Sequence, residues 1–301
     1  MSSETAEIPP ARMKITTVIG TRPQYIKAAP VSRALLAHGH IDETIIDTGQ
    51  HFDFEMSEVF IQQLGVPRPA INFGVHSKTH AQMTGEILIK AEAILQEQRP
   101  DAVLIYGDTN STLAAALAAV KLGIPIAHVE GGIRLAIKNP EEINRRLVDH
   151  VSSLIFCPTR RAVQALAEEN IRNGVHFVGD TMLDATRMVA ELFKSHPHDF
   201  HDMSGAYAPY VLMTIHRAEN TNDKRHFENI LTYVQKEAGG QNIVFPAHPR
   251  TVQFCCNNNI SLDPFRVIKP IGYFDMYSLL RGASAVFTDS GGLQKEAFFH
   301  R

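Results

Sequence analysis

The chain has 301 residues, 44% apolar and 20% charged, a composition typical of a globular protein long enough for two domains with separate cores. Its net charge of −3 gives no indication of nucleic acid or an anionic membrane as the main partner, and we expect neither; no apolar run is long enough to span a membrane. Three cysteines, Cys157, Cys255 and Cys256, form neither a disulfide framework nor a metal spacing and fit a reducing cytoplasm. Residues 1–12 are polar and are expected to be a loose arm.

Short apolar runs alternate with amphipathic stretches from residue 15 onwards. This repeated strand–helix–strand order predicts a parallel sheet with helices on both faces. The expected strands are 15–19, 44–46, 102–106, 124–129 and 154–157, and the expected helices are 27–37, 81–98 and 109–122.

A second series of the same kind follows a polar stretch at 195–209. We therefore predict an α/β protein of two Rossmann-like, doubly wound domains, 13–195 and 207–301. In such sheets ligands bind outside the carboxyl ends of the strands, so a cleft between the domains is the expected site. The expected strands of the second domain are 210–215, 242–245, 266–268 and 285–288.

Polar residues or glycines follow six of the predicted strands, which is a stronger signal than any single motif. They stand where parallel strands present their carboxyl ends to a ligand. These segments are Gly20-Thr21-Arg22, Gly107-Asp108, Glu130-Gly131-Gly132, Thr214-Ile215-His216, Ala247-His248 and Asp289-Ser290.

The turn after the first strand, Gly20-Thr21-Arg22-Pro23, stands where a dinucleotide-binding fold would have Gly-x-Gly-x-x-Gly. Because that fingerprint is absent, we expect neither a nicotinamide nor a flavin cofactor. Arg22 and Lys27 could both face the cleft and bind a diphosphate, although ordinary surface charge would look the same.

Three acids near the strand ends of the first domain, Asp108, Glu130 and Glu141, form a candidate acid–base set. Chemistry at a carbon that carries a weakly acidic proton needs a base on one face and an acid on the other. Each acid alone is more often a helix cap or half of an ion pair, and Asp108 could cap a helix starting at Thr109. Glu141 and Arg145 are four residues apart at the start of a helix and could pair.

Two histidines that follow strands of the second domain, His216 and His248, could bind phosphate or transfer a proton. Three others, His196, His198 and His201, are spaced as closely in the sequence as metal ligands often are, but no acidic or cysteine partner is near them. We interpret these three as part of a solvated loop and expect no metal site.

The segment Ser290-Gly291-Gly292 joins an apolar run, 283–287, which is expected to be a buried strand, to a helix. The glycines let a ligand approach the backbone, and the helix start favours phosphate. Glu296, further along that helix, could accept hydrogen bonds from a ribose diol, which indicates a nucleotide. An ordinary serine N-cap with a glycine turn would have the same sequence.

With these segments in order, the chain resembles the non-hydrolysing UDP-N-acetylglucosamine 2-epimerase family. The resemblance runs over nearly the whole chain from Lys14. Its blocks are IGTRPQYIKAAP (19–30), TGQH (48–51), GDTNSTLAAAL (107–117), VEGGIR (129–134), EEINR (141–145), GDTMLD (179–184), IHRAEN (215–220), PAHPRT (246–251) and DSGGLQKEA (289–297).

The resemblance implies a GT-B arrangement of the two domains and a mechanism in which UDP is eliminated and then added again through a glycal. It requires no metal or redox cofactor, and it implies a homodimer. The residues that match the family pattern fall into four groups. The acid–base carboxylates of the family are matched by Asp108, Glu130 and Glu141, and its diphosphate and sugar contacts by Arg22, Lys27 and His216. The phosphate loop is matched by Ser290, Gly291 and Gly292, and the ribose acceptor by Glu296.

The chain also departs from the family pattern. Gln24 stands where UDP-N-acetylglucosamine enzymes usually have Glu, and the segment 51–57 looks closer to relatives that act on UDP-2,3-diacetamido-glucuronic acid. The aromatic residue expected near the uracil is Met276, with Tyr273 as a substitute. Family members continue beyond position 301 with another strand, an arginine loop and helices, so we expect an incomplete second domain.

Three other functions share these features. A GT-B glycosyltransferase would bind UDP in the same way, but the three carboxylates favour proton transfer at C2. A hydrolysing epimerase would differ only in whether water or UDP attacks the intermediate. A non-catalytic protein that binds UDP-sugars would show binding without turnover.

Overall fold

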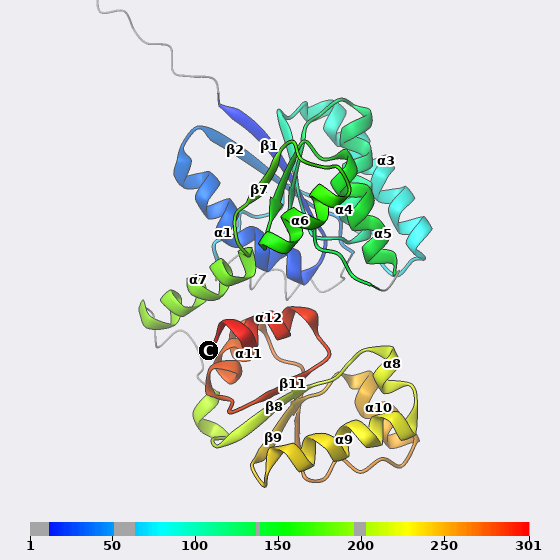
Figure 1. Ribbon diagram of the computed structural model, residues 1–301, viewed down its shortest axis with the longest axis vertical. Helices are drawn as coiled ribbons and strands as arrows, with labels where there is room; N and C mark the ends of the chain where they lie inside the picture. Colours follow the sequence, from blue (N-terminus) through cyan, green and yellow to red (C-terminus); the bar gives the residue numbers. More distant parts are fainter. Residues whose placement is uncertain (1–11, 51–63, 137–138, 196–202, 301) are drawn as a thin grey trace, which may run out of the picture. The chain divides into compact units, whose positions relative to one another are not determined.

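The computed structural model describes residues 12–50, 64–136, 139–195 and 203–300 (Figure 1). The chain divides into two compact units, unit 1 at Met1–Ala185 and unit 2 at Thr186–Arg301. The division falls within α7 (Thr181–Ser195), whereas the sequence placed the linker just after this helix. Among the described residues, no helix combines the length and apolarity needed to cross a membrane.

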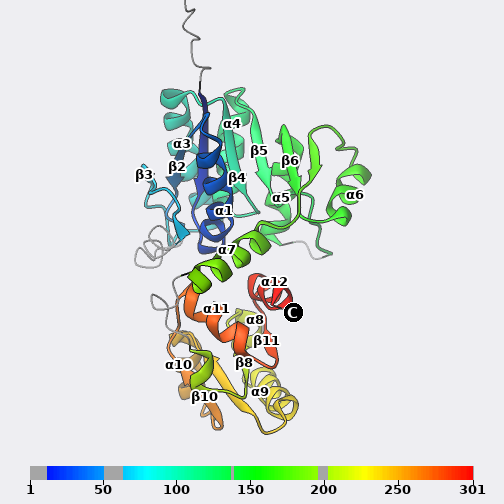
Figure 2. The same ribbon diagram turned by 90° about the vertical axis from the view of Figure 1, so that its left-hand side faces the viewer.

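Unit 1 is built on a seven-stranded sheet whose described pairings are all parallel, in the order β3-β2-β1-β4-β5-β6-β7. Figure 2 shows most of these strands side by side. The predicted strands are all present, and β3 and β7 are additional. The strands are β1 Met13–Ile19, β2 Ile41–Asp47, β3 Ile71–Asn72, β4 Ala102–Tyr106, β5 Ile126–Val129, β6 Leu154–Cys157 and β7 Val175–Phe177.

Helices cover both faces of this sheet, as a doubly wound fold requires. The cluster around Val18, Val103 and Ile105 packs against buried side chains of α3 and α4, while α1 lies on the opposite face (Figure 1). Alanines of α4 are fully buried there, because their small side chains let the helix approach the sheet closely. The helices are α1 Arg22–His38, α3 His80–Gln98, α4 Asn110–Lys121, α5 Pro140–Val151 and α6 Arg160–Glu168.

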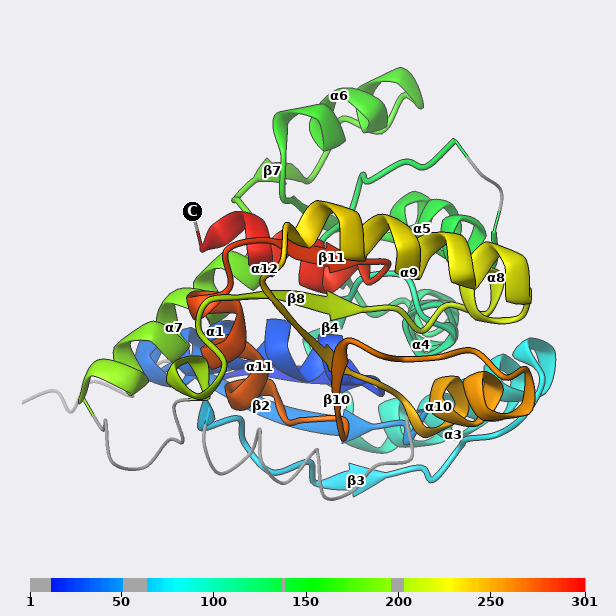
Figure 3. The ribbon, with the colours of Figure 1, turned by 90° about the horizontal axis from the view of Figure 1, so that it is seen from below.

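Unit 2 has a second parallel sheet in the order β10-β9-β8-β11. One face packs against α9 and α10, and the other against α11 and α12; Figure 3 shows α9 running along β8. The elements are η1 Ser204–Ala206, β8 Tyr210–Thr214, α8 Ala218–Thr221, α9 Lys224–Ala238, β9 Asn242–Pro246, α10 Pro249–Asn257, β10 Phe265–Ile268, α11 Tyr273–Gly282, β11 Val286–Thr288 and α12 Gly291–Phe299.

The predicted fold class, two doubly wound α/β domains, is confirmed in each unit. One strand differs from its prediction: the run 283–287 was expected to be a buried strand, but β11 begins at Val286 and is only half-buried. In the described sheet β11 is an edge strand paired on one side with β8, so its other side is less covered. Strand order reverses between β1 and β4 in unit 1 and between β8 and β11 in unit 2, which are the positions where such sheets bind ligands.

Candidate active site

The turn after β1 is packed so closely that only glycine fits at Gly20. A Cβ there would lie 1.9 Å from the Oγ1 of Thr48 and 2.6 Å from the Oγ of Ser111. The chain enters α1 directly after this turn, so Arg22 and Lys27 both lie in the first two turns of the helix. The two predicted cations therefore stand at the carboxyl end of the sheet.

Gln24 is a buried amide that joins two strand-end turns. Its Oε1 accepts hydrogen bonds from the backbone N–H groups of Gly20 at 2.9 Å and Thr21 at 3.1 Å. Its Nε2 donates to the carbonyl of Tyr106 at 2.8 Å and to the Oγ1 of Thr112 at 3.0 Å. Gln24 thus belongs to the framework that holds the turns after β1 and β4 together.

Glu130 follows β5 and forms an ion pair with Lys27 of α1. The two side chains are only 11% and 12% exposed. The φ angle of Glu130 is +69°, an uncommon left-handed conformation for a residue with a side chain, and such conformations concentrate at functional sites. A Cβ on Gly107 would lie 3.6 Å from Lys27 Nζ and 3.7 Å from Glu130 Oε2, so the end of β4 lies beside this ion pair.

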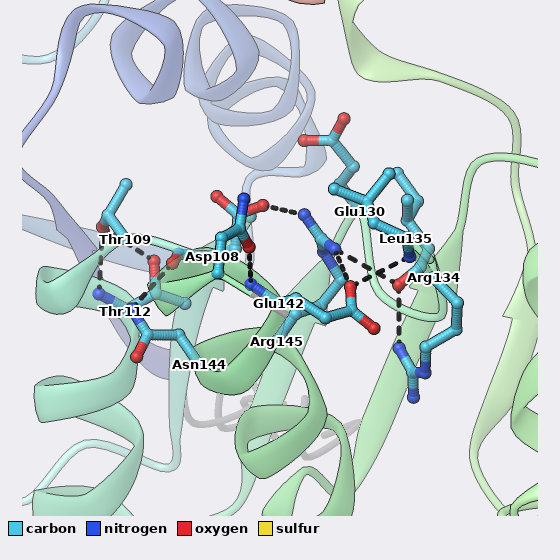
Figure 4. A network of polar contacts seen from close by, with 12 residues as sticks. Asp108, Thr109, Thr112, Glu130, Arg134, Leu135, Glu142, Asn144 and Arg145 are labelled. Carbon is cyan, nitrogen blue, oxygen red and sulfur yellow. Dashed lines mark hydrogen bonds and ion pairs between the residues drawn. The ribbon is translucent and has the colours of Figure 1, made fainter. Parts of the chain in front are cut away.

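Asp108, which comes directly after Gly107, pairs with a different cation. Arg145 of α5 donates from Nη2 to the carboxylate of Asp108, and Asn144 donates to the Asp108 carbonyl at 3.0 Å (Figure 4). The other terminal nitrogen of Arg145, Nη1, donates to Oε2 of Glu142 at 2.7 Å. The buried guanidinium therefore links Asp108 to a second, buried carboxylate.

Two interpretations from the sequence are wrong at these residues. Arg145 pairs with Glu142 and Asp108 and not with Glu141, because the guanidinium is buried and Glu142 faces the interior, whereas Glu141 is exposed. Asp108 does not cap α4. The N-cap is Thr109, whose side chain accepts from a backbone N–H one turn into the helix.

The structure thus brings Asp108 and Glu130 to the ends of two adjacent strands, β4 and β5. Each carboxylate lies against a cation of its own, Lys27 for Glu130 and Arg145 for Asp108. Glu141, the third predicted acid, lies in the exposed first turn of α5, the helix that also carries Arg145.

In unit 2, Asp289 organises the segment that carries His216, a role that sequence reasoning missed. Its Oδ2 accepts from the backbone N–H groups of His216 at 3.0 Å and Arg217 at 2.9 Å, and from Asn220 Nδ2 at 2.9 Å. His216 Nδ1 lies 3.2 Å from the other carboxylate oxygen, Oδ1. The buried Asp289 carboxylate therefore fixes the loop after β8, while the imidazole of His216 is 53% exposed.

The predicted phosphate loop starts a helix as expected. Ser290 is the N-cap of α12, and its Oγ accepts from the N–H of Leu293 at 3.4 Å. A Cβ on Gly291 would meet nothing within 4 Å, and one on Gly292 only the Oγ of Ser290 at 3.9 Å. The fold therefore does not require glycine at either position. Glu296, in the same helix, is buried.

Two other predicted residues of unit 2 begin helices. His248 is the N-cap of α10, and its Nδ1 accepts from the N–H of Arg250 at 3.2 Å. A ring whose Nδ1 accepts carries its proton on Nε2, which is then a donor. Tyr273 begins α11, is 3% exposed and packs edge-on against Phe274.

Some sequence predictions fall outside the described residues. These are the segment 51–57, which bears on substrate identity, and the histidines His196, His198 and His201. Within the part of the chain that the structure describes, no group of three or more His, Cys, Asp or Glu side chains could hold a metal ion.

Doubly wound units with polar turns at their switch points are the architecture of nucleotide-binding proteins. Comparison with known sequences narrows this class. The profile of a family described as UDP-N-acetylglucosamine 2-epimerase matches residues 33–301. The chain belongs to this family.

Three relatives show how far the similarity extends. A UDP-N-acetylglucosamine 2-epimerase homolog of Methanococcus maripaludis is 44% identical over 95% of this chain and 81% of its own length. The UDP-2,3-diacetamido-2,3-dideoxy-D-glucuronate 2-epimerase of Pseudomonas aeruginosa is also 44% identical, with the same coverage. A crystal structure of Methanocaldococcus jannaschii UDP-GlcNAc 2-epimerase, in complex with UDP-GlcNAc and UDP, is similar with a TM-score of 0.86 and 38% identity over 96% of this chain and 82% of that one.

Proposed function

We propose that this chain is a non-hydrolysing UDP-sugar 2-epimerase that interconverts UDP-N-acetylglucosamine and UDP-N-acetylmannosamine. The observation that carries the proposal is the placement of Asp108 and Glu130 at adjacent strand ends, each beside its own cation. Membership of the epimerase family and the relatives bound to UDP-GlcNAc support it.

In the proposed reaction one carboxylate removes the proton from C2 of the sugar. The electron pair left on C2 forms a double bond to C1 while the bond from C1 to the phosphate oxygen breaks, and UDP leaves. A second acid returns a proton to C2 from the opposite face, and UDP adds again to C1. We propose that Asp108, Glu130 and Glu141 supply the base and the acid. Asp108 and Glu130 lie at the ends of β4 and β5, and Glu141 lies in the first turn of α5, the helix whose Arg145 binds Asp108.

The departing UDP needs positive charge near its β-phosphate. Arg22 and Lys27 in the first turns of α1, together with His216, supply it. Lys27 also pairs with Glu130, so the cation that binds the diphosphate is next to a group that transfers the proton. Departure of UDP and proton removal at C2 are thereby coupled.

The second unit holds the nucleotide. Ser290, Gly291 and Gly292 receive the phosphates at the start of α12, and the open space at Gly291 is what a phosphate close to the backbone requires. Glu296 accepts from the ribose diol, His248 contributes its Nε2–H, and Tyr273 lies near the uracil. Arg145 acts on the sugar side through Asp108.

UDP-2,3-diacetamido-2,3-dideoxy-glucuronate is the second candidate substrate. The Pseudomonas aeruginosa enzyme named for it is 44% identical to this chain, as is the Methanococcus maripaludis UDP-N-acetylglucosamine 2-epimerase homolog, and the Methanocaldococcus jannaschii UDP-N-acetylglucosamine enzyme is 39% identical. Gln24, where the latter class usually has Glu, points the same way. The two candidates share the reaction at C2 and differ in the sugar.

Proton NMR of the 301-residue chain with UDP-N-acetylglucosamine in D2O tests the proposal. We expect deuterium at C2 and a second UDP-sugar anomeric signal. Free UDP with free sugar would show a hydrolysing enzyme instead. Exchange only with the diacetamido uronate would establish the second candidate, and binding of both sugars without exchange would contradict an epimerase.

Two features of the proposal concern the setting of the enzyme. UDP-sugars are cytoplasmic metabolites, so the enzyme acts in the cytoplasm, and the three cysteines, all free, fit that compartment. We also propose that two copies associate as a homodimer. Sedimentation of the purified chain tests this, and a monomer at all concentrations would contradict it.

A further inference from the structure

Acidic and basic side chains of unit 1 alternate around a closed ring. Successive members are joined by ion pairs, and the ring closes through the backbone between Gly107 and Asp108. It includes side chains from four different segments of the chain. In order, the members are Asp108, Arg145, Glu142, Arg146, Glu169, Arg134, Asp149 and His128.

The outer part of the ring is held by arginines. Arg134 makes two parallel bonds to Glu169, at 2.8 and 2.7 Å, and donates to Asp149 at 2.7 Å. Arg146 joins Glu169 at 2.6 Å to Glu142 at 2.8 Å. Two-point arginine–carboxylate contacts fix geometry as well as charge, so this part of the ring is a rigid support.

The inner part is the pair of His128 and Asp149, whose side chains are fully buried. The Nε2 of His128 lies 2.7 Å from the carbonyl oxygen of Gly107, which only accepts, so Nε2 carries a proton. The Nδ1 lies 2.8 Å from Oδ1 of Asp149, whose Oδ2 accepts from Gly132 N–H at 3.0 Å and from Arg134.

The Asp149 carboxylate is ionised, because its Oδ2 accepts from the Gly132 N–H and from the Arg134 guanidinium, so the Nδ1 of His128 must also be a donor. Burial alone would raise the pKa of Asp149, but hydrogen bonds and charge from His128 and Arg134 outweigh burial and leave that pKa below its ordinary value. Cys157 on β6 is a further titratable neighbour of Asp149. Burial and the negative charge of Asp149 raise the pKa of the Cys157 thiol to about 11, so this thiol is neutral. Both ring nitrogens of His128 therefore carry protons, and the ring has equal numbers of positive and negative members.

The pair also connects the two loops that carry the acids. His128 holds the Gly107 carbonyl just before Asp108, and Asp149 holds the Gly132 N–H just after the Glu130 turn. The packing is close, since a Cβ on Gly131 would lie 2.7 Å from Asp149 Oδ1. A shift of the pair would move both loops.

We propose that His128 and Asp149 form a buried imidazolium–carboxylate pair that positions Asp108 and Glu130 for proton transfer, which rests on the proposed epimerase function. His128 is a positioning residue, because its contacts are to protein groups behind the strand ends. Its loss therefore acts on the rate of the chemical step more than on the binding of UDP.

Two-bond 1H–15N spectra of the full chain labelled in histidine test the charge directly. We expect both ring nitrogens of His128 to carry protons in the wild-type chain, because each of them faces an acceptor. In Asp149→Asn the carboxylate that accepts from Nδ1 is gone, and we expect Nδ1 to be unprotonated. An unprotonated Nδ1 in the wild-type chain, or a His128 still charged in Asp149→Asn, would overturn the pair.

Kinetics test the positioning role. His128→Gln keeps a donor for the Gly107 carbonyl but has no charge, and we expect kcat to fall about 100-fold with KM changed by less than about threefold. His38→Gln, on the exposed end of α1, is the matched control and should keep wild-type kinetics. A wild-type kcat in His128→Gln, or a loss confined to KM, would refute positioning. If the wild-type chain exchanges no C2 proton with either sugar, the proposed function is wrong, and the spectra still decide the imidazolium.

Discussion

The two units present different kinds of strand ends, although both are parallel α/β sheets with a switch point. In unit 1 the acids Asp108 and Glu130 are paired with partly or fully buried cations. In unit 2 the buried Asp289 is held mainly by backbone N–H groups, His216 is exposed, and the turn into α12 has open space at Gly291.

This difference matches the division of work that the proposed function assigns to the two units. Proton transfer needs groups that are already in place, and pairing of each acid with a fixed cation achieves this in unit 1. Binding of a nucleotide needs room and unused donors, which a helix start with two glycines offers in unit 2. Substitutions should therefore affect rate in unit 1 and affinity in unit 2.

The largest effect is expected for Glu130→Gln, which keeps the shape of the side chain but cannot exchange a proton. We expect kcat to fall about 10²–10⁴-fold, the usual contribution of a general acid or base. The affinity for UDP, measured by calorimetry, should change little. Glu191→Gln, on an exposed side chain of α7, is the control. A variant with near-normal turnover would remove Glu130 from the acid–base set.

The next largest effect is expected when one glycine from each unit is replaced by alanine and the stabilities of the two variants are compared. In Gly131→Ala the new Cβ would lie 2.3 Å from Ile155 and 2.7 Å from Asp149, so stability should fall by about 1–3 kcal/mol. In Gly291→Ala nothing lies within 4 Å, so stability should stay within about 0.5 kcal/mol.

Urea unfolding and calorimetry with UDP measure both effects. Gly291→Ala should bind UDP about tenfold or more weakly, a loss of about 1.4 kcal/mol, because the methyl group occupies the space proposed for phosphate. Equal stability losses in the two variants, or unchanged UDP affinity in Gly291→Ala, would contradict the division between the units.

Gln24→Glu tests the framework beneath the site. The Nε2 that donates to the Tyr106 carbonyl would become an oxygen facing an oxygen, so we expect a loss of about 1–3 kcal/mol in unfolding free energy at pH 8. Gln253→Glu on exposed α10 is the matched control and should be near neutral. The midpoints of urea unfolding of the two variants measure this loss. Equal midpoints would show that the Gln24 amide is not needed for stability.

The smallest effect concerns Glu43, a partly buried acid of β2 that accepts a hydrogen bond from the Thr17 hydroxyl. Burial raises the pKa of Glu43 above its ordinary value, outweighing its hydrogen bonds, so the protonated form is favoured in the folded state. The wild-type chain therefore loses stability as pH rises from the ordinary value through the raised one. Glu43→Gln should match the wild type at pH 4 and be more stable at pH 8 in urea unfolding. A constant difference across this range would contradict the shift.

Sequence reasoning succeeded where the signal is local. Strand ends follow from apolar runs, and parallel sheets bring such ends to one edge, so the sequence alone is enough to place Asp108 and Glu130 at neighbouring strand ends. It failed on partner choice: the i,i+4 rule paired Arg145 with Glu141, but burial selected Glu142. Asp289 was noted only as part of a strand-end motif.

Contacts between distant positions have no sequence signal of their own. Arg134 and Glu169 are 35 residues apart, and His128 reaches a backbone carbonyl 21 residues earlier. The residues around each of these positions do not identify its partner. Correlated substitutions at two positions would do so, but a single sequence cannot show them. The charged ring could therefore be found only from the structure.

The alternation of charge around the ring limits how this sequence can change. Loss of a buried member such as Arg145 or Asp149 leaves a neighbour with uncompensated charge in the interior, which typically costs about 3–5 kcal/mol, whereas replacement of both partners by apolar groups can be neutral. Arg134 and Glu169, for example, are expected to tolerate a joint replacement better than either single one. Among homologues, ring positions far apart in the chain should consequently change in pairs, and an inherited change at one of them should persist only where its partner has changed too.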